Sequence, residues 1–144
     1  MFLGRRRTAP FAALVAIASF ATCSEGTGVE NTPQDFSGNY TLMSFSQGSA
    51  AFVTLVPGTT GTFTLTATTY QASIHLLVPV DTMVVDEGTY TASGSTTAGT
   101  WGQQSTTVPT LQYAGTYTYD TATDRLTLDT TAQGIRTVLE LQKN

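Results

Sequence analysis

Hydrophobic and polar residues alternate along most of the chain from residue 36 onward. One four-residue pattern of glycine, a small polar residue, an aromatic residue and threonine occurs four times, as GNYT at 38–41, GTFT at 61–64 and GTYT at 88–91 and 115–118. Successive side chains on a β-strand point to opposite faces, so each ring lies on one face and its polar neighbours lie on the other. The pattern predicts that each copy opens a strand whose ring points inward.

If the rings point inward, the residue two positions further on does so as well. The predicted inward pairs are Tyr40 with Leu42, Phe63 with Leu65, Tyr90 with Ala92, and Tyr117 with Tyr119. Threonine or asparagine flanks the ring on the other face in every copy, which is typical of an antiparallel sheet with one face in water. A helical period does not place polar residues on both sides of each aromatic residue.

The same alternation, interrupted by turn residues, predicts nine strands. Their ranges are 38–46, 51–56, 61–69, 71–78, 80–92, 96–103, 108–120, 124–130 and 135–142. The four copies begin 23, 27 and 27 residues apart, a spacing that holds one hairpin with its turns. We therefore expect an all-β fold, an antiparallel up-and-down β-barrel, with a β-sandwich as the alternative. Closure into a barrel removes the unpaired strand edges that a Thr- and Val-rich sheet would expose.

Composition and charge narrow the class of protein. Charged residues make up only 11% of the chain, and hydroxyl groups supply the missing polarity; threonine is β-branched and favours strands. Three of the six basic residues are Arg5, Arg6 and Arg7, whereas all ten acidic residues lie at Glu25 or later. Without the first 22 residues the chain has 3 basic and 10 acidic groups, a net charge of −7. This balance argues against nucleic-acid binding and against direct attraction to anionic membranes.

The first 22 residues have the layout of an export signal. Three arginines precede an apolar run over 11–21, which is shorter than the roughly 20 apolar residues of a membrane-spanning helix. We expect residues 1–22 to be a signal peptide in the form of an export signal helix. Residues 23–35 are polar, contain glycine and proline, and are predicted to be a flexible tether before a domain over 36–144.

Cys23 is the only cysteine, so no internal disulfide can form. The sequence SFATC resembles a bacterial lipobox, the pattern that ends in the cysteine to be acylated, although Phe20 and Thr22 replace the residues usual there. We expect lipidation at Cys23 and attachment to the cell envelope, at the outer membrane or its periplasmic face. Ordinary signal cleavage and secretion is the alternative.

Three segments carry a resemblance to a known family: FSGNYTLMSF at the domain start, the repeated GTYT, and DRLTLDTTAQGIRTVLELQK at the end. They resemble bacterial lipocalin-like lipoproteins, in which a short eight-stranded barrel follows a lipobox. The resemblance covers residues 36 to 143. Tyr40 stands where lipocalins have the tryptophan of a Gly-x-Trp motif. The resemblance implies that Arg136 takes the place of the late-strand arginine that packs over that aromatic residue.

The residues that usually carry catalysis or metal binding are sparse. His75 is the only histidine and lies in the apolar segment SIHLLVP, so it is interpreted as a strand residue at the barrel wall or rim. Asp81, Asp86 and Glu87 lack the spacing of a calcium loop, and so do the aspartates at 120–129; both groups are interpreted as turn residues. We expect no enzyme activity, no metal and no cofactor.

The aromatic residues instead suggest a binding cavity. Inward tyrosines need hydrogen-bond partners, which indicates a partly wet interior, and an eight-stranded barrel can hold one small ligand. The predicted function is non-catalytic binding of a small apolar or amphipathic ligand; a structural or interaction module with a filled core is the alternative. The expected cavity residues are Tyr40, Leu42, Phe63, Leu65, Tyr90, Trp101, Tyr117 and Tyr119.

Overall fold

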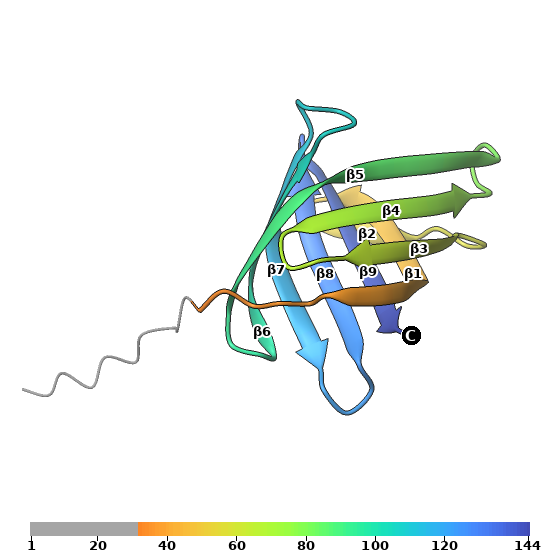
Figure 1. Ribbon diagram of the computed structural model, residues 1–144. Coiled ribbons are helices and arrows are strands. Elements are labelled where there is room, and N and C mark those ends of the chain that lie inside the picture. The colour runs from red at the N-terminus through yellow and green to blue at the C-terminus, as the bar shows by residue number, and fades with distance from the viewer. Residues whose placement is uncertain (1–31) are drawn as a thin grey trace, which may run out of the picture.

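The computed structural model describes residues 32–144, which form one antiparallel sheet closed into a barrel (Figure 1). Among these residues there is no helix, and hence none able to cross a membrane. The strands are β1 (Gly38–Ser49), β2 (Phe52–Leu55), β3 (Thr60–Leu65), β4 (Thr69–Leu76), β5 (Thr82–Gly94), β6 (Ala98–Ser105), β7 (Gln112–Asp120), β8 (Arg125–Ala132) and β9 (Ile135–Lys143).

The strand order confirms the predicted up-and-down barrel and excludes the sandwich. Strands β3 to β9 pair with their neighbours in chain order, and β1 pairs with both β3 and β9, so eight strands close the barrel. Strand β2 is additional and pairs only with β1. Each of the nine predicted strands has a counterpart. The largest boundary errors are four residues each. Strand β3 ends at Leu65 rather than at 69, and β7 begins at Gln112 rather than at 108, because Val108 and Leu111 close a turn through a main-chain hydrogen bond of 2.8 Å.

The four repeated rings all point into the barrel, as predicted. The exposed fractions of Tyr40, Phe63, Tyr90 and Tyr117 are 1%, 4%, 2% and 1%, and the polar residues on either side of each ring are exposed. The prediction that every copy opens a strand is wrong for two of them. The copies at 38–41 and 61–64 lie at the starts of β1 and β3, but those at 88–91 and 115–118 lie within β5 and β7.

The glycines of those two copies permit close contact between strands rather than turns. A Cβ atom on Gly88 would lie 2.0 Å from the carbonyl oxygen of Gln104, and one on Gly115 would lie 2.0 Å from that of Asp129. Both oxygens belong to main chain of the neighbouring strand, which a rotamer change cannot move aside. Glycine is therefore required at both positions, because the main chain of the neighbouring strand leaves no space for a side chain.

One edge of β1 is divided between two partners. Its first residues, 38–41, pair with 62–65 of β3, and its last residues, 46–49, pair with 52–55 of β2. The opposite edge pairs with β9 through eight residue pairs, with a bulge between Leu42 and Ser44. The β1–β3 pairing, with four residue pairs, is the shortest between neighbouring strands of the barrel wall.

One end of the barrel is closed by the segment that leads into β1. The main chain at Thr32 and Gln34 hydrogen-bonds to Gly94 and Ala92 at the end of β5, with distances of 3.0 and 2.9 Å. Phe36 then inserts its ring between aromatic side chains, with a centroid distance of 4.9 Å to Tyr117. The folded part thus reaches back to Thr32, which the sequence assigned to the flexible tether.

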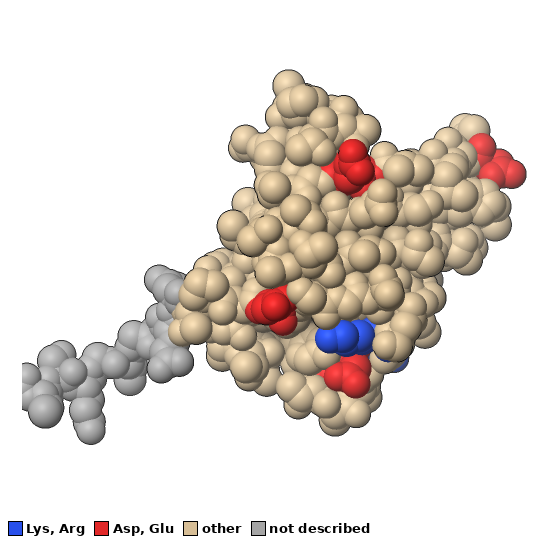
Figure 2. Space-filling view, in the orientation of Figure 1, with Lys and Arg blue, Asp and Glu red and all other residues tan. Residues whose placement is uncertain are grey.

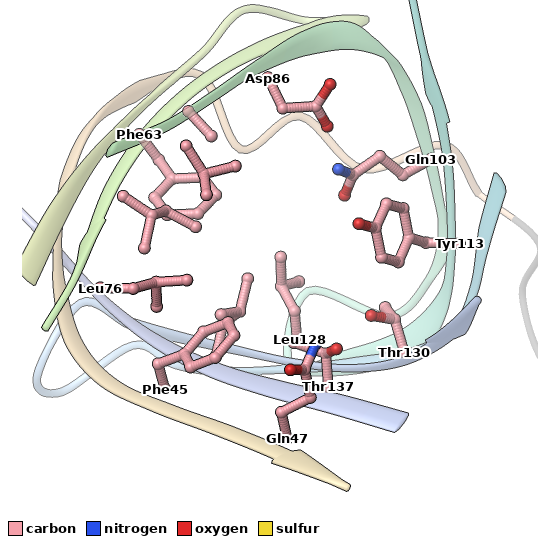
Figure 3. Close-up of a pocket in the computed structure, with 14 residues that line it drawn as sticks. Phe45, Gln47, Phe63, Leu76, Asp86, Gln103, Tyr113, Leu128, Thr130 and Thr137 are labelled. Atoms are coloured by element: carbon pink, nitrogen blue, oxygen red, sulfur yellow. The ribbon is translucent and has the colours of Figure 1, made fainter. Parts of the chain in front are cut away.

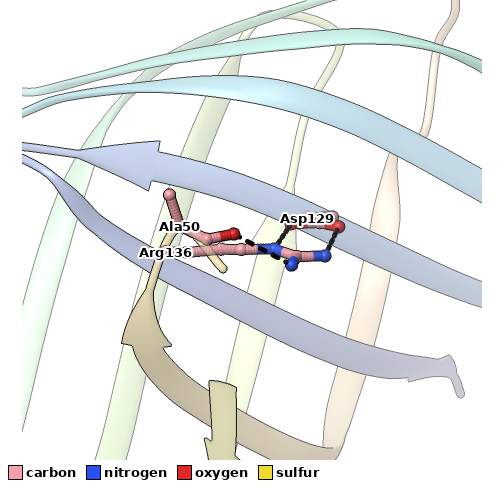
Figure 4. A network of polar contacts seen from close by, with 3 residues as sticks. All are labelled: Ala50, Asp129 and Arg136. Carbon is pink, nitrogen blue, oxygen red and sulfur yellow. Dashed lines mark hydrogen bonds and ion pairs between the residues drawn. The ribbon is translucent and has the colours of Figure 1, made fainter. Parts of the chain in front are cut away.

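The face of the molecule drawn in Figure 2 carries few charged side chains, and threonines make up much of the outward-facing surface of the strands. The best-defined ion pair on the outside of the barrel is formed by Arg136 and Asp129, whose side chains are about one-third exposed and make two parallel hydrogen bonds of 2.8 and 2.6 Å (Figure 4). Arg136 also donates to the carbonyl oxygen of Ala50. The hydrogen bonds from Arg136 to Asp129 hold the pKa of that carboxyl below its ordinary value.

The expectation that Arg136 packs over the first aromatic residue is wrong. Arg136 lies opposite Gly48, near the far end of β1 from Tyr40. Lys143 occupies the expected place, because it pairs with Tyr40 across the β1–β9 ladder and its Nζ lies 5.9 Å from the ring centroid. That distance is within the range of a cation–π interaction. The final strand thus supplies a cation to this ring through a residue seven positions later than predicted.

Candidate ligand cavity

The end of the barrel opposite the Phe36 plug contains a cavity of about 180 Å³. Figure 3 shows its 14 lining side chains arranged around a central space. Apolar side chains form one part of the wall and polar side chains form the other. The apolar part consists of Phe45, Phe63, Ala72, Ile74, Leu76, Val84, Leu128 and Leu139. The polar part consists of Gln47, Asp86, Gln103, Tyr113, Thr130 and Thr137.

The polar wall offers hydrogen-bonding groups that the fold itself does not use. Thr130 and Thr137 face each other across β8 and β9, and within the described part of the chain their hydroxyls have no side-chain partner. The Tyr113 hydroxyl likewise makes no hydrogen bond to the described residues, and burial raises its pKa, so it stays neutral and able to donate. No buried side-chain polar atom of the described part lacks a partner, so these free hydroxyls must border open space.

The residues that the sequence assigned to a cavity lie mostly elsewhere. Phe63 lines the cavity, and Tyr119 is half-buried at the plugged end. The rings of Tyr90 and Trp101 stack at 4.5 Å, and Phe36 packs near them. The remaining members of the set are buried in the side-chain core and do not line the cavity; they are Tyr40, Leu42, Leu65, Tyr90, Trp101 and Tyr117.

The three tyrosines of the repeated pattern find their partners in the main chain rather than in cavity water. The hydroxyls of Tyr40, Tyr90 and Tyr117 donate to the carbonyl oxygens of Phe36, Thr66 and Ser95, with distances of 2.8, 2.6 and 2.5 Å. All three acceptors lie at the plugged end, in the leading segment and in the β3–β4 and β5–β6 turns. The repeated rings therefore fasten loops at one end, which explains why a tyrosine-rich interior does not require a wet cavity there.

Sequence reasoning missed the polar wall, although the strand pattern contains the signal. Counting back two positions at a time from Tyr90 along β5 gives Gly88, Asp86 and Val84 as inward positions. The same count back from Tyr117 along β7 gives Gly115 and Tyr113. The interpretation of Asp86 as a turn residue is therefore wrong, because it lies within β5 and faces the interior.

His75 and Asp81 form a separate contact outside the cavity. His75 lies on the outer face of β4, near the rim, and its Nε2 is 2.6 Å from Oδ1 of Asp81 in the following loop. The barrel wall separates this pair from the cavity, since Ile74 and Leu76 on either side of His75 point inward. Across residues 32–144 no group of three or more His, Cys, Asp or Glu side chains is close enough to hold a metal ion.

Large exposed apolar side chains gather around the open end. Most lie in the β1–β2–β3 connection, the β4–β5 hairpin, the β6–β7 loop and the start of β9. They are Phe52, Leu55, Leu77, Val78, Val80, Met83, Val84, Val85, Val108 and Ile135. Among the described residues the plugged end carries none of comparable size. The two ends of the barrel thus differ in both packing and polarity.

Comparisons with protein-family models, curated proteins and solved structures return no significant match. The site is therefore defined by the geometry of this chain alone. Cys23, the export segment 1–22 and most of the tether lie outside the described residues.

Proposed function

We propose that this chain is an exported, lipid-anchored, lipocalin-like barrel that binds a small amphipathic ligand without chemistry. The cavity carries the proposal, because it combines an apolar wall with free hydroxyls and opens at the end of a barrel whose other end is plugged. The resemblance of residues 36 to 143 to lipocalin-like lipoproteins agrees with the eight-stranded antiparallel architecture. Attachment through Cys23 agrees with the export-like segment before it.

The size of the cavity limits the ligand. An apolar cavity of about 150 Å³ is enough to bind benzene, whereas pockets for drug-sized molecules measure roughly 300–1,000 Å³. A space of about 180 Å³ therefore accepts one ring or a short chain. Any larger part of the ligand must extend out of the cavity past the apolar rim. The exposed side chains of Leu77 and Val80 are available there to contact it.

Ligand binding can be tested with three probes that share a phenyl ring: 2-phenylethanol, 2-phenylethylamine and phenylacetate. We expect at least one of them to bind saturably in a calorimetric titration. Ala72→Leu should weaken this binding at least tenfold, because Ala72 is a buried part of the cavity wall and the larger side chain fills the space. Ala114→Leu is the matched control, since Ala114 is exposed on β7. Absence of binding by all three probes, or equal binding by Ala72→Leu, would contradict the proposal.

The anchor is tested by expressing the full 144-residue chain in a bacterial host, purifying the protein from the membrane fraction and measuring its intact mass. We expect a mature protein that begins at Cys23 and carries several acyl groups, because stable membrane anchoring requires more than one acyl chain. Cys23→Ser should abolish the added mass and release the protein from the membrane fraction. A mature chain with a free thiol, cleaved before Cys23, would instead support the alternative of plain secretion.

A further inference from the structure

Among residues 32–144, Asp86 is the only charged side chain that lines the cavity. Two hydroxyls on the neighbouring strands hold its carboxylate in place. The Tyr70 hydroxyl on β4 donates to Oδ2 over 2.7 Å, and the Ser105 hydroxyl on β6 donates to Oδ1 over 2.5 Å. Both donors are buried, with exposed fractions of 3% and 1%. The carboxylate is thus fixed at one position on the cavity wall.

No cationic side chain of the described part neutralises this carboxylate. The two ion pairs found within residues 32–144 are His75–Asp81 and Arg136–Asp129, both on the outer face. The remaining basic residues in this range are Arg125 and Lys143, and neither lines the cavity. A carboxylate has about four acceptor positions, so two hydroxyl donors leave others available. A partly buried charge in a half-apolar cavity is stabilised by a partner of opposite sign.

An aromatic ring on the Asp86 side of the cavity, that of Tyr113, adds to the preference for a cation. The rings of Phe45, Phe63 and Tyr113 all line the space, and Figure 3 shows Tyr113 and Gln103 on the same side as Asp86. The faces of aromatic rings are electron-rich and attract organic cations. The phenyl rings and Leu76 lie on the other side, where an apolar group would be accommodated.

From this arrangement we infer that the ligand is a small organic cation, with an ammonium group beside Asp86 and a ring or short chain against Phe45, Phe63 and Leu76. The inference rests on the ligand-binding function proposed above and specifies its chemical class. The body of the protein is acidic overall, which also favours the approach of cations over anions.

The three phenyl probes test this inference through their relative affinities at pH 7. We expect 2-phenylethylamine, which is cationic at this pH, to bind at least tenfold more tightly than neutral 2-phenylethanol, because hydrogen bonds to charged groups are stronger than neutral ones. Phenylacetate should bind most weakly. Asp86→Asn should remove the preference for the amine, so that the amine and the alcohol bind the variant with affinities within about threefold of each other.

Asp120→Asn is the matched control, because it removes one carboxylate from the exposed end of β7, at the plugged end, and should preserve the preference. If the three probes bind the unchanged protein with equal affinity, the inference is overturned and ligand binding stands. If none of the three probes binds, the proposed ligand-binding function and the inference about its chemical class both fail. The comparison within the unchanged protein decides the question even where Asp86→Asn does not fold.

Discussion

Gly115→Ala is expected to lower the free energy of unfolding by more than about 3 kcal/mol, a large fraction of the roughly 5–15 kcal/mol that stabilises a typical domain. The added methyl group would lie 2.0 Å from the carbonyl oxygen of Asp129 and 2.7 Å from the Cα of Thr130. Both atoms belong to the main chain of β8, so the methyl group can be accommodated only if the β7–β8 ladder separates.

Gly102→Ala is the matched control for this substitution. Gly102 lies within β6, and its added methyl group would meet only the side-chain oxygen of Thr91, at 3.0 Å. Thr91 is exposed and free to rotate, so the change in unfolding free energy should stay within about 1 kcal/mol. Urea denaturation followed by the fluorescence of Trp101, the only tryptophan, measures both variants. Equal stability of the two would contradict the role assigned to Gly115.

Alkaline pH is expected to unfold the barrel cooperatively, with all six tyrosines ionising together. Burial raises the pKa of each one above its ordinary value of about 10. A group whose pKa is raised by folding contributes stability that is complete below its unfolded pKa and is lost as the pH rises through the folded pKa. Stability should therefore decline above about pH 10, since the unfolded chain releases these protons first.

The measurement combines tyrosinate absorbance with circular dichroism over the same pH series. The folded protein should show little tyrosinate at pH 10, and the absorbance should then rise steeply where the sheet signal disappears. The chain in concentrated urea serves as the reference and should titrate smoothly around pH 10. Gradual ionisation of the folded protein at that pH, with the sheet signal unchanged, would show that the hydroxyls are not held by main-chain carbonyls such as those of Phe36 and Thr66.

The sequence was sufficient to predict the barrel because alternation controls which side chains are buried. The pattern of glycine, polar residue, aromatic residue and threonine placed Tyr40, Phe63, Tyr90 and Tyr117 on the inner face, and all four are buried there. Inward direction does not reveal height along the barrel axis, however. Whether a ring packs in the plugged core or lines the cavity depends on the stagger between strands, which alternation within one strand does not specify.

The polar side of the cavity was missed for a different reason. In the sequence Asp86 stands close to Asp81 and Glu87, although Asp81 lies in a loop and Glu87 points outward. Its actual neighbours, Tyr70 and Ser105, lie on adjacent strands, 16 and 19 residues away. Such a cluster is created only by pairing between strands. Within the sequence of one strand nothing marks the partners of Asp86, and an isolated aspartate is most readily interpreted as a turn residue.

The short pairing between β1 and β3 has a consequence for how molecules reach the interior. Separating four residue pairs breaks fewer main-chain hydrogen bonds than separating any other two neighbouring strands of the wall, so we expect thermal breathing to concentrate there. Phe63 is one of the paired residues of β3, and Phe45 lies on β1 four residues beyond the last paired one; both line the cavity. A transient opening between β1 and β3 would therefore admit a ligand through the side of the barrel, while the end closed by Phe36 stays intact.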